Sequence, residues 1–135
     1  MKVILDTNIW ISFLIGHHLP EIRNIVSDDR FDVIVCPQLM WEIVDVSNRS
    51  KIRKYIDNYD ISDLLRIIRS YCQSVEIEMD AVSEIRDSKD PYLLSLADTV
   101  GALYIVSGDA DLVTIGKHGN TKIITLAEFK RLYLK

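Results

Sequence analysis

Residues 2–14 read KVILDTNIWISFL, and this stretch sets the alternation of strand and helix from which the fold is inferred. Its first part, Lys2 to Asp6, is largely β-branched and apolar, which is typical of a buried parallel strand. Its second part, Thr7 to Leu14, continues directly in a helical pattern. The stretch therefore predicts a strand that leads at once into a helix, with Asp6 at the junction.

The same alternation of strand and helix continues along the chain. We expect strands over 31–35, 75–77, 103–106 and 122–125, helices over 20–28, 37–46, 51–56, 62–72, 92–100 and 126–133, and a short turn or helix over 109–113. This order predicts an α/β protein, a three-layer α/β/α sandwich with a mainly parallel central sheet. Because no repeat or linker composition marks a boundary, we expect a single domain over 1–135.

Size, composition and charge narrow the class of protein. With 135 residues, 48% of them hydrophobic, the chain is long enough to bury a substantial core. Its apolar runs are too short to cross a bilayer, and Asp6 and Asn8 interrupt the first run before a signal-peptide pattern is complete. We therefore expect a cytoplasmic protein. The net charge of −4 argues against a broad basic surface for nucleic acid.

Cysteines and basic residues supply few candidate sites. Cys36 and Cys72 stand in apolar and helical patterns without zinc-ligand spacing, so both are expected to be core thiols. Local RNA contacts are expected at Arg49, Lys51, Arg53 and Lys54, with a weaker basic cluster at Lys117, His118 and Lys122. A solvated helix face is the alternative for each cluster.

Four separated acidic residues, Asp6, Glu42, Asp90 and Asp109, each follow or border an apolar run. In parallel sheets the loops at the carboxyl ends of the strands converge on one crevice, where all four acids could meet. Two carboxylates about 5 Å apart repel by roughly 3 kcal/mol at an effective dielectric near 20. Since no Lys or Arg accompanies Asp6 or Asp109 in its loop, a divalent cation with oxygen ligands is the simpler compensation.

Each acid also has an ordinary structural explanation. Asp6 and Asp90 could cap the helices that follow them, and Glu42 could be a solvated helix residue off the Leu39–Ile43–Val46 stripe. Asp109 and Asp111 could be loop residues after Gly108. The placement of the four acids by itself indicates a metal or phosphate site in an α/β domain.

Four segments in this order resemble the PIN-domain family over nearly the whole chain. They are VILDTNIWIS at the start, the Glu42 helix, RDSKDPY and VSGDADL. The resemblance is to the VapC-like toxin ribonucleases of toxin–antitoxin pairs, and it implies a PIN-like, Rossmann-like fold.

The resemblance implies a metal-dependent endoribonuclease that hydrolyses RNA phosphodiester bonds. Asp6, Glu42, Asp90 and Asp109 would be catalytic and would hold Mg²⁺ or Mn²⁺ together with Asp111. Asn8, Ser107 and Asp87 would be supporting residues. Asp87 competes with Asp90 for the same role, and Asp90, followed by Pro91, fits the family pattern better.

The implied partners are an RNA substrate, a cognate antitoxin protein and a second copy of the chain. Trp10, Phe13 and Leu14 are candidates for the dimer interface, with burial in the monomer as the alternative. The rival to the enzyme is a non-catalytic PIN-like scaffold that binds metal or RNA. A receiver-like domain lacks support because the chain offers no strand-end Lys.

Overall fold

The computed structural model describes residues 1–77 and 91–134. Strand β1 lies inside a mainly parallel sheet whose strand order is β3-β2-β1-β4-β6-β5. The strands are β1 (Lys2–Leu5), β2 (Asp32–Val35), β3 (Gln73–Ser74), β4 (Tyr104–Val106), β5 (Lys117–His118) and β6 (Thr121–Ile124). Only the β5–β6 pairing is antiparallel among the described strands. The predicted α/β class with a mainly parallel sheet is confirmed.

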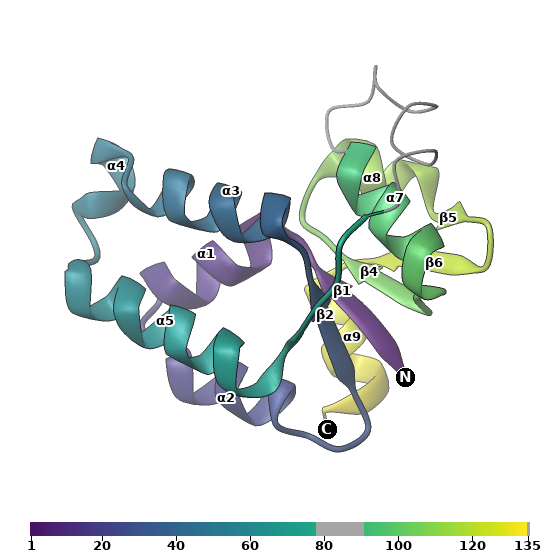
Figure 1. Cartoon of the computed structure of the whole chain (residues 1–135), viewed down its shortest axis with the longest axis horizontal. Coiled ribbons are helices and arrows are strands. Elements are labelled where there is room, and N and C mark those ends of the chain that lie inside the picture. Colours follow the sequence, from purple (N-terminus) through teal and green to yellow (C-terminus); the bar gives the residue numbers. More distant parts are fainter. Residues whose placement is uncertain (78–90, 135) are drawn as a thin grey trace.

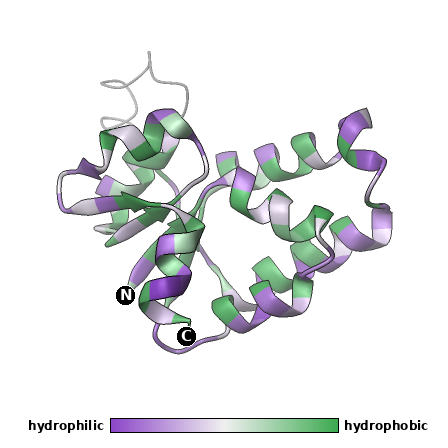
Figure 2. Ribbon diagram, turned by 180° about the vertical axis from the view of Figure 1, so that it is seen from behind, coloured by the Kyte–Doolittle hydropathy of each residue, from purple (hydrophilic) through white to green (hydrophobic). Residues whose placement is uncertain are grey.

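Helices connect and cover these strands. They are α1 (Thr7–Ile15), α2 (Leu19–Val26), α3 (Pro37–Ser47), α4 (Ser50–Arg53), α5 (Asn58–Tyr71), α7 (Pro91–Val100), α8 (Ala110–Ile115) and α9 (Leu126–Tyr133). Helix α7 packs on β1 and β4 on one side of the sheet, and α9 lies on the other side, as the opposite views of Figures 1 and 2 show. The predicted layering of helices about a central sheet is therefore present.

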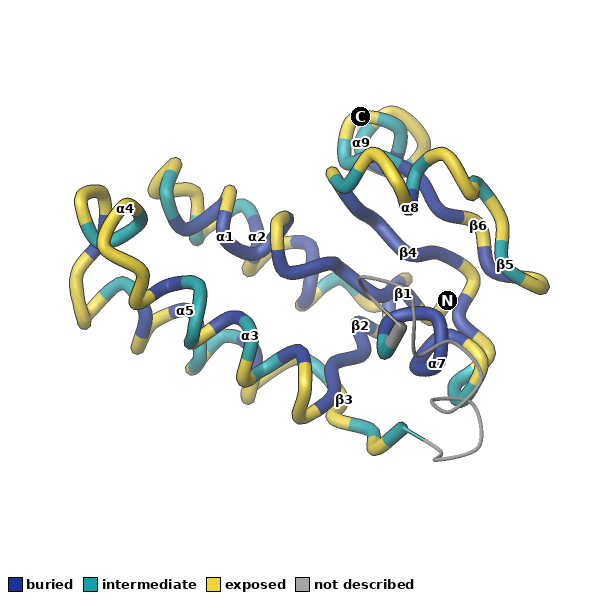
Figure 3. The backbone as a smooth tube through the Cα atoms, turned by 90° about the horizontal axis from the view of Figure 1, so that it is seen from above, coloured by how far each residue is buried: buried dark blue, intermediate teal, exposed yellow. Residues whose placement is uncertain are grey.

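Helices α1, α2, α3 and α5 form an arm that extends from one side of the sheet (Figures 1 and 3). Within this arm α1 contacts α3, α2 and α5, and α2 contacts α5. Helix α4 lies at the outer end of the arm. The first turn of α3 is the part of the arm that lies beside the sheet, near the end of β1 (Figure 1).

The core is continuous from the sheet into the arm. Strands β1, β2 and β4 are almost wholly buried, as Figure 3 shows in dark blue. Trp10 on α1 is fully buried, and its indole N–H donates to the carbonyl of Leu5 at 3.0 Å. On the α9 side, Phe129 packs against Phe31 with ring centroids 5.1 Å apart. These contacts bury the apolar residues that the strand and helix patterns predict.

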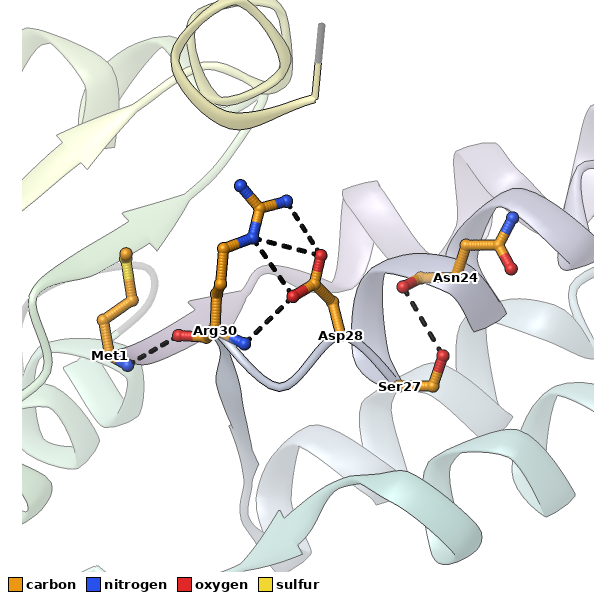
Figure 4. Close-up of polar contacts among 5 residues, drawn as sticks. All are labelled: Met1, Asn24, Ser27, Asp28 and Arg30. Carbon is orange, nitrogen blue, oxygen red and sulfur yellow. Dashed lines mark hydrogen bonds and ion pairs between the residues drawn. The ribbon is translucent and has the colours of Figure 1, made fainter.

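A compact turn joins α2 to β2 and orders the N-terminus (Figure 4). The Asp28 carboxylate accepts hydrogen bonds from the backbone N–H of Arg30 at 2.9 Å and from its guanidinium at 2.8 Å. The guanidinium beside it lowers the pKa of Asp28. The amino group of Met1 donates to the Arg30 carbonyl at 2.7 Å, which fixes the chain end where β1 begins beside β2.

Several expected boundaries are wrong. Helix α5 begins at Asn58 rather than at residue 62 because Asp57 is its N-cap, and Asp57 and Asp60 form a capping box. Strand β3 is Gln73–Ser74 instead of 75–77. Strand β5 was not expected, since its two residues carry no periodic pattern. Among the helices that the structure describes, none combines the length and the apolar composition that a membrane span requires.

The interface interpretation of Trp10, Phe13 and Leu14 is wrong. All three are buried within the chain, with 3% of their surface exposed at most. They belong to the core through which α1 packs against the rest of the arm and the sheet. Burial in the monomer, the alternative from the sequence, explains them.

The capping box predicts that Asp57→Ala lowers the free energy of unfolding by about 1 kcal/mol. The reason is that the backbone N–H of Asp60, which donates to Asp57 at 3.0 Å, loses its acceptor. Urea denaturation measures this change. Ser62→Ala, an exposed substitution inside α5, is the matched control and should leave stability nearly unchanged. An equal loss in both variants would contradict the assigned helix start.

Candidate active site

The pairing of β1 with β4 builds the centre of the site. Leu5 lies opposite Val106 in the parallel register, and the backbone N–H of Asp6 donates to the Val106 carbonyl at 2.9 Å. The next residues, Asp6 and Ser107, therefore lie side by side at the carboxyl ends of the two strands. This is the edge at which open α/β sheets collect their ligands.

Asp6 is a buried carboxylate with 3% of its surface exposed. Its Oδ1 accepts from the backbone N–H of Thr7 at 2.6 Å, and its Oδ2 accepts from the hydroxyl of Ser107 at 2.6 Å. Asp6 is also the N-cap of α1, so the cap predicted from the sequence and the site share one side chain. The two donors fix the orientation of the carboxylate.

Asp109 is tied to Asp6 through Ser107. The Ser107 hydroxyl accepts from the backbone N–H of Asp109 at 3.0 Å while it donates to Asp6. The Asp109 carboxylate in turn accepts from the backbone N–H of Asp111 at 3.0 Å and caps α8. A chain of hydrogen bonds thus runs from β1 through the end of β4 into α8.

Glu42 reaches the same region from α3. Its Oε1 accepts a hydrogen bond from the Thr7 hydroxyl and a second one from the Tyr92 hydroxyl at 2.6 Å. The Thr7 and Tyr92 hydroxyl oxygens lie 3.5 Å apart. Residues from α1, α3 and α7 therefore meet in one small polar cluster beside Asp6.

The electrostatics of the site show that its carboxylates interact. Burial raises the pKa of Asp6, the Ser107 and Thr7 hydrogen bonds oppose the rise, and the charges of Glu42 and Asp109 add to it. Burial also raises the pKa of Tyr92, and its hydrogen bond to Glu42 raises it further, so the phenol stays a proton donor. Negative charge accumulates here with no basic side chain among the described hydrogen-bond partners of these acids.

Hydrogen bonds link Asp6, Ser107 and Asp109, and Glu42 lies close enough to Asp6 for their charges to interact. The side chain of Asp111 is exposed, and Asn8 is exposed as well. Asp87 and Asp90 lie outside the described residues. The basic residues of α4 lie at the outer end of the arm, away from the end of β1 (Figure 1).

Sequence reasoning missed Thr7 and Tyr92. Thr7 follows Asp6 directly, so its place in the DTN segment was a usable signal. Tyr92 lies 50 residues from its partner Glu42, and nothing local in the sequence indicates that contact. It is the second residue of α7, beside the site only because α7 packs on β1 and β4.

The donor set suits a hard divalent cation. The described acids offer carboxylate oxygens, the ligands that Mg²⁺ and Mn²⁺ favour, and a cation would offset their mutual repulsion. In residues 1–77 and 91–134, however, no three acidic, His or Cys side chains converge closely enough to hold a metal by themselves. The described acids thus fit part of a metal site rather than a complete one.

The raised pKa of Asp6 predicts that its ionised form destabilises the metal-free fold. An acid whose pKa is higher in the folded state loses stability as pH rises from its ordinary value, 3.8, through the raised value. Asp6→Asn should therefore raise the melting temperature in EDTA at pH 7, because the uncharged amide can still accept from the Thr7 N–H through its oxygen and can donate to the Ser107 hydroxyl oxygen through its NH2 group. The gain should shrink as pH falls toward 3.8.

Thermal melts across pH measure the effect, with the exposed Asp63→Asn on α5 as the control that should show no comparable gain. A lower melting temperature for Asp6→Asn at pH 7 would mean that the hydrogen bonds of the carboxylate outweigh its burial.

Comparisons with known proteins identify the family of the chain. The chain is 29% identical over 119 residues to the uncharacterised protein MJ1680 of Methanocaldococcus jannaschii, over 85% of this chain and 75% of the relative. Its fold matches the crystal structure of VapC20 of Mycobacterium tuberculosis, a sarcin–ricin loop cleaving toxin, with a TM-score of 0.61 at 13% identity, over 89% of this chain and 98% of the other. The PIN domain family matches residues 2–111, which span Asp6 to Asp109. The chain therefore belongs to the PIN domain family.

Proposed function

We propose that this protein is an endoribonuclease that uses Mg²⁺ or Mn²⁺ to hydrolyse RNA phosphodiester bonds. The observation that carries the proposal is the Asp6 carboxylate, whose pKa is raised mainly by its burial and further by the charges of Glu42 and Asp109. Burying interacting carboxylates destabilises a fold unless a cation offsets them, so such a cluster is characteristic of a functional site. Membership of the PIN domain family supports the reaction class.

Asp6, Glu42 and Asp109, together with Asp90 from outside the described residues, would hold the metal, and Asp111 would support them. When bound, the metal supplies an activated water and neutralises charge on the phosphate. The chain itself keeps the carboxylates oriented: Thr7 and Ser107 fix Asp6, and Ser107 and Asp111 fix Asp109. Asn8 and Asp87 are proposed as supporting residues.

A mechanism based on histidine has little support. His118 pairs with Asp98 at 3.0 Å on the α7–β5 side, and His17 and His18 lie in the connection between α1 and α2. Among the described hydrogen bonds, none of them contacts Asp6, Glu42 or Asp109. We therefore propose hydrolysis by water, which leaves a 5′-phosphate and a 3′-hydroxyl.

The proposed setting is a toxin–antitoxin pair in the cytoplasm. The similarity of the fold to VapC20 supports a toxin, and a cognate antitoxin protein would block the carboxylates, with an Arg as a suitable ion-pair donor. A homodimer is proposed as well. Its interface would use exposed surface, because α1 buries its large apolar residues.

Asp6→Asn and Asp109→Asn should each lower the rate of RNA cleavage by orders of magnitude while the fold persists, because both remove a proposed metal ligand. The assay uses a structured RNA with Mn²⁺ or EDTA and identifies the product ends. Asp63→Asn removes an exposed acid from α5 and should cleave at the wild-type rate. A 2′,3′-cyclic phosphate would contradict hydrolysis by water, and metal binding without cleavage would favour the scaffold alternative.

The basic cluster predicts a second effect on RNA. Arg49 pairs with Asp45 and Arg53 with Asn58, whereas Lys51 and Lys54 are exposed. Replacing both Lys51 and Lys54 with Ala should weaken RNA binding. The slope of the logarithm of the RNA association constant against the logarithm of the salt concentration should also become shallower, by about 0.7 for each RNA phosphate that these lysines neutralise. Binding titrations at several salt concentrations measure this. The same double substitution at Lys117 and Lys122, in the weaker basic cluster, is the charge-matched control, and an equal loss there would contradict a specific role for Lys51 and Lys54.

A further inference from the structure

We propose that Tyr92 is a positioning residue. Together with Thr7 it donates hydrogen bonds to one carboxylate oxygen of Glu42, Oε1, and so leaves the other oxygen, Oε2, to bind the metal. This inference rests on the proposed function and deepens it. It assigns Tyr92 a role in the nuclease site and predicts that Glu42 binds the cation through Oε2 alone.

The geometry of the cluster carries the argument. Thr7 and Tyr92 both donate to the same atom, Glu42 Oε1, rather than one to each oxygen. A carboxylate oxygen has two lone-pair sites, so two donors fill Oε1. Among the described residues no hydrogen bond reaches Oε2. The asymmetry leaves one oxygen with its acceptor capacity free, which is what a monodentate ligand requires.

The donors themselves are held in place by the fold. Thr7 is buried at the first position of α1, and Tyr92 is half-buried at the second position of α7. A glutamate side chain loses considerable rotamer freedom when it is fixed. Tyr92 and Thr7 hold it before a cation arrives, so that less of this entropy is lost on metal binding. Groups that orient metal ligands in this way are typically worth 10–100-fold in affinity.

A purely structural role for Tyr92 predicts a different result. A buried phenol needs a hydrogen-bond partner, and Glu42 satisfies it whether or not a metal binds. In that case removal of the hydroxyl would change stability and leave metal affinity alone. The two roles are therefore distinguished by metal binding in the absence of RNA.

The test is Tyr92→Phe, measured by calorimetric titration of the full chain with Mn²⁺. We expect Mn²⁺ affinity to fall at least about 10-fold, while the metal-free variant keeps its circular dichroism spectrum. Tyr133→Phe is the matched control, because it removes a phenol that bonds the Tyr104 hydroxyl at 2.8 Å on the α9 side of the sheet. Its Mn²⁺ affinity should equal that of the wild type.

Glu42→Gln, alone and combined with Tyr92→Phe, shows whether Tyr92 acts through Glu42. We expect no further loss of Mn²⁺ affinity when Tyr92→Phe is added to Glu42→Gln; a full additional loss would overturn the inference. Unchanged affinity in Tyr92→Phe would also overturn it. If Tyr92→Phe does not fold, Thr7→Val, which removes the other donor, must lower the affinity in the same way. A wild-type chain that binds no Mn²⁺ would instead overturn the proposed function itself.

Discussion

The parallel pairing of β1 with β4 is the constraint on which the site depends. It sets Leu5 opposite Val106, and so places Asp6 beside Ser107 although 101 residues separate them. A slip of one residue would turn Asp6 to the other face of the sheet and break the chain of hydrogen bonds to Asp109. The buried apolar side chains of both strands hold the register against such a slip. Packing of the core thus determines where the carboxylates lie.

The same carboxylates can cap helices and form the candidate site at this edge of the sheet. Asp6 and Asp109 are both N-caps, and each accepts from the backbone at the start of the helix that follows. The free N–H groups of a helix N-terminus stabilise negative charge, which lowers the cost of bringing the carboxylates together. Glu42 comes from the middle of a helix and lacks this help. Its negative charge is instead met by hydroxyl donors from α1 and α7.

Much of the fold could be predicted from the sequence, because strands and helices here follow their ordinary patterns. Asp6 and Asp109 could be placed together since both follow strands, and strand ends converge. The hydrogen-bond partners of Glu42 could not be predicted. Thr7 and Tyr92 lie 35 and 50 residues from it in the sequence, and such contacts depend on how the helices pack rather than on local spacing. The start of α5 was misplaced for a smaller reason: Asp57, Asp60 and Ser62 are all good caps, and only the structure shows which backbone N–H groups they meet.

The ends of the sheet affect how copies of the chain can associate. Both outer strands, β3 and β5, are only two residues long, and β5 carries Lys117 on its exposed part. Edges this short and charged offer too few free backbone groups for a strand of another molecule to extend the sheet. The described part of the chain is thereby protected from edge-to-edge aggregation.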